Sequence, residues 1–314
     1  MRKIFWIIIS VVILLISAGC KKTDDNSDKG GLNIVATIFP AYDFARAVAE
    51  ETAEITMLVK PGESIHSYDP SITDINKIRN ADVFVCIGGE SEAWVERILA
   101  SVDKEKMVII RLIDEVDAER LEDEFVHDDH DHDHDGHGDE DDEHIWTSPI
   151  YAIQMVEAIA DGLCAADGEN EEMYRNNAAE YVAEIRVLDG VFKDIVKDAP
   201  KNIIVVGDRF PLYYFVNEYG LEYAAAFGGC SDQTDASVAT IARLVKEVRK
   251  NELNYIFYVE LSTRNTANTI SEETGAETLM FHSCQNVTRT EFESGETYVS
   301  LMQKNAENLR KGLN

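Results

Sequence analysis

The chain has 314 residues, of which 45% are hydrophobic, and its formal net charge is −30 at pH 7. The hydrophobic content is normal for a globular protein, so disorder throughout is excluded, and the length suits one large or two ordinary domains. The negative charge argues against nucleic acid and anionic membrane surfaces as partners and makes cations the natural ones.

The first 20 residues have the layout of a secretory signal. Two basic residues precede an apolar run over 4–16, which is too short for a comfortable membrane span, and small residues at 17–19 lead into Cys20. That ending resembles the lipobox of bacterial lipoproteins, although Ser17 stands where leucine is usual. We expect a lipoprotein signal peptide over 1–20, with acylated Cys20 in the lipid bilayer and the chain on the extracytoplasmic face of the cell membrane. An uncleaved anchor or plain secretion is the alternative.

Residues 33–166 are expected to form an N-terminal α/β lobe, after a polar, glycine-ended stretch at 21–32 that suits a flexible tether. Continuous apolar runs alternate here with amphipathic stretches, which predicts a parallel sheet covered by helices on both faces. The expected strands are at 34–39, 55–59, 83–87 and 107–110.

An acidic, histidine-rich loop at 121–144 interrupts this alternation. Residues 127–143 are only histidine, acidic residues and glycine, so nothing apolar anchors them and we expect them to be mobile, whereas His144 is anchored by the helix start that follows it. Interleaved histidine and aspartate suit metal ions, so we interpret the loop as a low-affinity metal collector, a shield or a sensor of metal excess. A solvated insert without function is the alternative. The accessory histidines are His127, His130, His132, His134 and His137.

A long helix is expected over 167–199 and a C-terminal α/β lobe over 200–314. The stretch 169–197 has apolar residues at helical spacing and would span roughly 40 Å. Strand-like runs then resume at 202–206, 221–227, 254–259 and 277–281. The predicted fold class is therefore α/β, with two lobes, each a mostly parallel four-stranded sheet with helices on both faces, joined by one long rigid helix.

Two cysteines of the C-terminal half each follow a predicted strand. An exported chain can oxidise its thiols, so Cys230 and Cys284 are a possible disulfide. Two buried thiols are the alternative.

Four metal-binding side chains fall in loops where strands end or a helix begins. His66 and His282 follow predicted strands, His144 ends the acidic loop just before a helix, and Asp208 follows the first strand of the second lobe. Carboxyl ends of parallel strands line ligand crevices, so these residues are placed to converge between the lobes. Three imidazoles and a carboxylate form a closed tetrahedral set that suits Zn²⁺, whereas Mn²⁺ favours more oxygen donors.

The stretches GESIHSYDPS and DEHIWTSP resemble the two histidine motifs of the zinc solute-binding proteins of ABC importers, the cluster A-I family. YIFYVE and TGAETLMF fit the same family, and the similarity runs from Asn33 to Asn314. The resemblance implies two α/β lobes bridged by a long helix, a metal site in the cleft between them, and delivery of the metal to a membrane permease. A histidine-rich acidic loop before the second motif is a feature of the zinc-specific members.

Position by position, the resemblance assigns the first two ligands to His66 and His144. The third ligand, usually histidine in zinc members and glutamate in manganese members, falls on Asp208, and the fourth, usually aspartate, falls on His282. The chain thus exchanges carboxylate and imidazole between its last two sites, and the Asp208 side chain is shorter than either usual occupant. Glu260 is a candidate partner that orients a ligand imidazole, with a salt bridge at a strand end as the alternative.

The predicted function is extracytoplasmic capture of Zn(II) and its delivery to an ABC permease, by a monomeric chain. The alternatives are a Mn(II)-binding import protein of the same family and a metal-dependent adhesin. A zinc hydrolase is disfavoured because the sequence lacks a helical HExxH motif, so we expect no enzyme.

Overall fold

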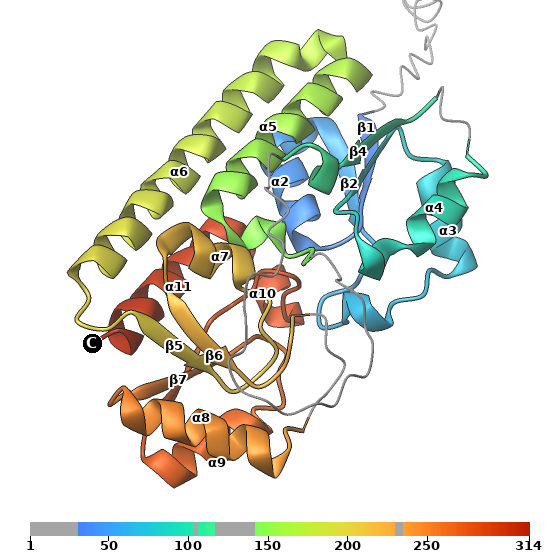
Figure 1. Cartoon of the computed structure of the whole chain (residues 1–314). Coiled ribbons are helices and arrows are strands. Elements are labelled where there is room, and N and C mark those ends of the chain that lie inside the picture. Colours follow the sequence, from blue (N-terminus) through green and yellow to red (C-terminus); the bar gives the residue numbers. More distant parts are fainter. Residues whose placement is uncertain (1–30, 103–105, 117–141, 230–234) are drawn as a thin grey trace, which may run out of the picture. The chain divides into compact units, whose positions relative to one another are not determined.

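The computed structural model describes residues 31–102, 106–116, 142–229 and 235–314 (Figure 1). Residues 32–314 form one compact unit. Within the described ranges, no helix is both long and apolar enough to cross a membrane. Several residues singled out in the sequence lie outside the described ranges and stay predictions: Cys20, His127, His130, His132, His134, His137 and Cys230.

The N-terminal half of the unit carries a parallel four-stranded sheet in the order β2-β1-β3-β4. Alternate residues of each strand face opposite sides, so Ile34 packs with one group of helices and Val35 with another. The strands are β1 (Leu32–Ala36), β2 (Ala53–Met57), β3 (Val83–Cys86) and β4 (Val108–Arg111). The helices are α2 (Phe39–Ala49) and α5 (Pro149–Ala166) on one face, and α3 (Ile72–Arg79) and α4 (Trp94–Leu99) on the other (Figure 1).

The C-terminal half repeats this plan, with a parallel sheet in the order β6-β5-β7-β8. Val206 faces the same hydrophobic cluster as the first sheet, whereas Val205 faces a separate cluster under α8 and α9. The strands are β5 (Ile203–Val206), β6 (Glu222–Ala225), β7 (Tyr255–Tyr258) and β8 (Glu277–Met280). The helices are α7 (Tyr213–Tyr219), α8 (Val238–Lys250), α9 (Asn265–Thr274), α10 (Arg289–Glu293) and α11 (Tyr298–Gly312).

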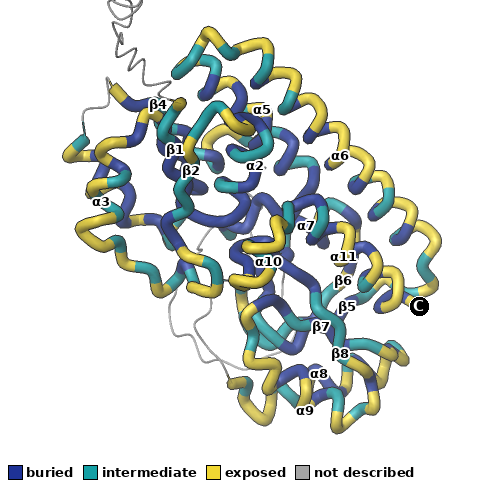
Figure 2. The backbone as a smooth tube through the Cα atoms, turned by 180° about the vertical axis from the view of Figure 1, so that it is seen from behind, coloured by how far each residue is buried: buried dark blue, intermediate teal, exposed yellow. Residues whose placement is uncertain are grey.

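The long helix α6 (Glu171–Asp198) has 28 residues and packs against both halves. Its buried residues recur every three or four positions, and its other side is exposed (Figure 2). Tyr181 contacts Phe44 of α2, and Phe192 packs edge-on against Phe215 of α7, with ring centroids 4.9 Å apart. One hydrophobic cluster therefore runs along α6 from the first sheet to the second.

The predicted fold class is confirmed, since each of the eight predicted strands is present and begins and ends within three residues of its expected bounds. The exact division into lobes at 166 and 199 stays a prediction, because residues 32–314 group as one unit.

Gly207 follows β5 at a point where the backbone of α9 comes close. A Cβ atom at this position would lie 2.6 Å from the Cα atom of Ala267, which is rigid backbone. We expect Gly207→Ala to lower the free energy of unfolding by about 1–3 kcal/mol, measured by urea denaturation. Gly190→Ala on the exposed side of α6 is the control, because a Cβ atom there would have no neighbour within 4 Å, and it should stabilise by about 0.5–1 kcal/mol. Equal effects of the two substitutions would contradict the argument.

Candidate metal centre

His66 and His144 lie side by side although 78 positions separate them in the sequence. His66 lies in a short 3-10 turn (Ile65–Ser67) beyond β2, and His144 directly precedes a second such turn (Ile145–Thr147) that leads into α5. Their ring centroids are 5.9 Å apart. The structure thus brings together the two histidines of the predicted motifs.

The Nδ1 atom of each of these imidazoles has a hydrogen-bonding partner. His144 Nδ1 lies 2.8 Å from Asp142 Oδ1, and His66 Nδ1 lies 2.8 Å from Ser91 Oγ. An ionised carboxylate only accepts hydrogen bonds, so Asp142 places the proton of neutral His144 on Nδ1 and leaves a lone pair on Nε2. This is the arrangement that a metal-binding imidazole needs.

Gln285 faces both Nε2 atoms, and the sequence analysis did not single it out. Its Nε2 atom lies 3.2 Å from His66 Nε2 and 3.5 Å from His144 Nε2. Gln285 is 8% exposed and lies three positions after His282 in the loop beyond β8. Gln285 follows the carboxyl end of β8, as His282 does, so the strand end that identified His282 could also have identified Gln285.

The loop that carries Gln285 is held by Glu260. The Glu260 carboxylate accepts hydrogen bonds from the backbone N–H of Ser283 at 2.7 Å and from its hydroxyl at 2.5 Å. The Ser283 hydroxyl oxygen in turn accepts from the Gln285 backbone N–H at 3.2 Å. Glu260 therefore orders the backbone on which Gln285 is presented.

Two further contacts tie this loop to the histidine loops. Trp146, two residues after His144, donates from its indole Nε1 to the Ser283 carbonyl at 2.8 Å. The Asn286 side chain donates to the carbonyls of Lys60 and Glu63, at 2.8 and 2.6 Å, in the segment before His66. The position of Gln285 between the two imidazoles is thus fixed from both sides.

His282 has a local structural role in this conformation. The backbone N–H of Cys284, whose φ is +61°, donates to His282 Nδ1 at 2.9 Å. Acceptance at Nδ1 puts the proton of a neutral ring on Nε2, which is buried, has no hydrogen-bond partner and lies 3.9 Å from Glu291 Oε2. Glu260 Oε2 lies 3.7 Å from Nδ1. The predicted fourth ligand therefore stabilises a strained turn.

Asp208 follows β5, as predicted, and offers an oxygen that is not hydrogen-bonded. Its Oδ1 atom accepts from the Arg209 N–H at 2.8 Å, whereas Oδ2 is buried without a hydrogen-bond partner. Arg209 is close enough to His144 to act on its charge. A buried carboxylate oxygen with no donor is costly, and a cation would offset that cost.

Within the described residues, no group of three or more histidine, cysteine, aspartate or glutamate side chains is arranged to hold a metal ion. The predicted set of His66, His144, Asp208 and His282 therefore stays a prediction that requires a change of conformation. Cys284 is a buried free thiol, and its predicted partner Cys230 lies outside the described residues.

Carboxylates dominate the electrostatics around His144. Burial, the largest single influence, lowers the pKa of His144, but Asp142 and then Glu143 outweigh it and hold the pKa above its usual value. Glu143 also accepts from the Ser91 N–H at 3.1 Å. Burial raises the pKa of the nearby Glu92 carboxyl to about 7. This negative environment favours a bound cation.

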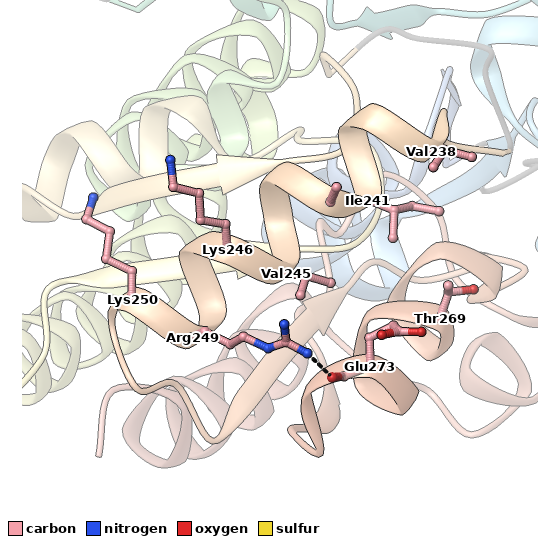
Figure 3. Close-up of a pocket in the computed structure, with 9 residues that line it drawn as sticks. Val238, Ile241, Val245, Lys246, Arg249, Lys250, Thr269 and Glu273 are labelled. Carbon is pink, nitrogen blue, oxygen red and sulfur yellow. Dashed lines mark hydrogen bonds between the residues drawn. The ribbon is translucent and has the colours of Figure 1, made fainter.

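A pocket of about 820 Å³ between α8 and α9 is not a metal site (Figure 3). Its polar side chains include Lys246, Arg249 and Lys250, and Arg249 donates to the Glu273 carbonyl at 2.6 Å. Clustered cationic side chains repel a metal ion and are not metal ligands.

Known proteins resemble this chain over nearly its full length. Residues 34–312 match the family described as "Zinc-uptake complex component A periplasmic" (ZnuA). The zinc-binding lipoprotein AdcA of Streptococcus pneumoniae is 34% identical over 313 residues, covering 99% of this chain and 61% of AdcA. The chain thus spans about three fifths of the length of that relative.

A second relative and one solved structure agree with this match. The high-affinity zinc uptake system protein ZnuA of Bacillus subtilis is 27% identical, covering 98% of this chain and 96% of that protein. The crystal structure of the Zn(II)-bound ZnuA-like domain of S. pneumoniae AdcA is 32% identical and covers 90% of this chain and 99% of that domain, with a TM-score of 0.75. Because the family model matches residues 34–312, the chain belongs to the ZnuA family of zinc-uptake components.

Proposed function

We propose that this protein captures Zn²⁺ between His66 and His144. The observation that carries the proposal is that both Nε2 atoms face one point, marked by Gln285 Nε2 at 3.2 and 3.5 Å. Asp142 at Nδ1 keeps the Nε2 lone pair of neutral His144 available, and Ser91 Oγ does the same for neutral His66 when it accepts from Nδ1–H. Imidazole nitrogens suit Zn²⁺ better than Ca²⁺ or Mg²⁺, which prefer oxygen.

The role of the captured ion follows from the family. A zinc-uptake component is a binding protein rather than an enzyme, and it serves transport when it passes its ion to the permease of an ABC importer. The zinc-binding relative AdcA is a lipoprotein, which supports a lipid anchor at Cys20 and a place on the extracytoplasmic face of the membrane. The histidine-rich loop would collect zinc near the site.

Asp208 and His282 are the further ligands that we propose for the zinc-loaded form. Asp208 has a buried oxygen without a donor, so a modest shift of its loop would add a carboxylate to the two imidazoles. His282 would first have to release the Cys284 N–H. While His282 stays in its turn, two imidazoles and one carboxylate leave a place for one more ligand.

Zinc affinity tests this function directly. The chain lacking residues 1–20, stripped of metal by a chelator, is titrated against zinc in competition with a chromophoric chelator at pH 7.5, and then against manganese. We expect one tight zinc site and much weaker manganese binding, because two nitrogen ligands favour zinc. Manganese binding as tight as zinc would favour manganese import, and no tight site for either ion would refute the proposal.

The histidine-rich loop needs its own control. In a chain in which the five histidines of the loop outside the described residues are replaced by serine, the tight site should persist and only weak additional zinc binding should disappear. Loss of the tight site in this variant would place it in the loop rather than between His66 and His144.

A further inference from the structure

The Gln285 side chain occupies the point on which the two imidazole lone pairs converge. A primary amide NH₂ group carries two hydrogens, so a single Nε2 atom can donate one hydrogen to His66 and one to His144. The two separations, 3.2 and 3.5 Å, fit one shorter and one longer hydrogen bond. Gln285 thus satisfies both nitrogens that a metal would need.

The orientation of this amide follows from its neighbours. Asp142 can only accept, which in the neutral ring leaves His144 Nε2 as an acceptor and requires a donor opposite it. The amide oxygen in that place would put two acceptors against each other, so hydrogen-bond logic selects the NH₂ group for this position. The same logic applies to His66 when its Nδ1–H donates to Ser91 Oγ.

We propose that the Gln285 amide is a built-in competitor for zinc that becomes a ligand when it turns. An N–H group facing a cation is repulsive, so zinc enters only after Nε2 leaves the two imidazoles. A half turn about the last side-chain bond exchanges the two amide ends and presents Oε1, a neutral oxygen donor, to the ion. This inference rests on the proposed zinc site and names a residue that determines its affinity.

The surrounding contacts hold the backbone of Gln285 in place. Its backbone N–H is held by Ser283, and the next residue, Asn286, is fixed by two hydrogen bonds to carbonyls before His66. Because the backbone is fixed, Gln285 moves through its side-chain torsions, and turning the amide plane is the smallest of these movements. An uncharged donor in this place makes zinc easier to release than a carboxylate would, which suits a protein that must hand its ion on.

Two substitutions separate the two halves of the proposal. Gln285→Glu removes the competing NH₂ group and supplies a charged oxygen, so zinc affinity should rise about ten- to a hundredfold. Gln285→Leu removes the competitor but also the oxygen ligand, and affinity should fall about tenfold. Gln303→Glu, which makes the same charge change on the exposed side of α11, is the matched control and should leave affinity within about twofold.

The competition assay with a chromophoric chelator measures these affinities, and circular dichroism melting confirms that each variant folds. In ¹⁵N-resolved NMR of the zinc-free protein, Gln285→Leu should also shift the Nε2 resonances of His66 and His144, because their hydrogen-bond donor is lost. Unchanged affinity in Gln285→Glu, or tighter binding in Gln285→Leu, would overturn the inference while leaving the zinc site intact. Absence of zinc binding in the wild-type chain would instead refute the proposed function.

Discussion

Replacing Asp43 with alanine should lower the free energy of unfolding by about 3 kcal/mol. Asp43 lies in α2, is 1% exposed, and accepts from the Tyr181 hydroxyl of α6 at 2.5 Å and from the Tyr298 N–H of α11 at 2.8 Å. Its other oxygen accepts from the Arg46 guanidinium at 2.5 Å. One carboxylate therefore joins helices from both halves of the chain, and its removal leaves two buried donors without an acceptor.

Urea denaturation of the metal-free protein measures the effect, with two comparison variants. Asp43→Asn keeps a side-chain oxygen for the buried donors but loses the charge beside Arg46, so its loss of stability should be smaller, about 1–2 kcal/mol. Asp161→Ala removes an exposed partner of Arg175 and should cost about 0–1 kcal/mol. A cost for Asp43→Ala no larger than for Asp161→Ala would contradict the linking role.

The fold could be predicted because the chain repeats strong local signals. Each buried strand is a short continuous apolar run, and each run is followed by a helical pattern, as in 83–87 before α4. The bounds of α6 were predictable too, because Pro200 ends a long stretch of helical spacing. Nothing in such patterns shows that Asp43 would be buried, since a single acidic residue at the start of a helix usually faces solvent.

The candidate site was predictable only in part, because histidine is a common metal ligand whereas a single glutamine gives no sign of metal binding. His66 and His144 were identified from motifs, and their proximity is a consequence of the parallel sheet order. His282 was assigned as the fourth ligand and stays a prediction, whereas no motif marks Gln285, three positions later. In this conformation the turn at Cys284, whose backbone is left-handed, engages the His282 ring in its own loop. A non-glycine residue with positive φ is not readable from sequence.

Zinc affinity should fall steeply when the pH is lowered from 8 to 5. Zinc binds the neutral imidazole, so protons compete with it, and once both His66 and His144 are protonated the affinity should fall about a hundredfold per pH unit. Asp142 and Glu143 hold the pKa of His144 above its usual value against the effect of burial. Proton competition therefore begins at a higher pH than it would for an ordinary histidine.

Asp142→Asn isolates the contribution of that carboxylate. Without it, Glu143 is left to oppose burial and the Arg209 charge, so the pKa of His144 falls, and the pH at which zinc binding is half lost should move downward. At pH 8 the same variant should bind zinc about ten- to a hundredfold more weakly, because the carboxylate also strengthens the imidazole as a ligand. Asp161→Asn controls for net charge. The chelator competition assay, repeated across the pH range, gives zinc affinity as a function of pH for the wild type and for Asp142→Asn. The two curves should differ in affinity at pH 8 and in the pH at which binding is half lost. An Asp142→Asn curve that coincides with the wild-type curve would show that His144 does not bind the ion through Nε2.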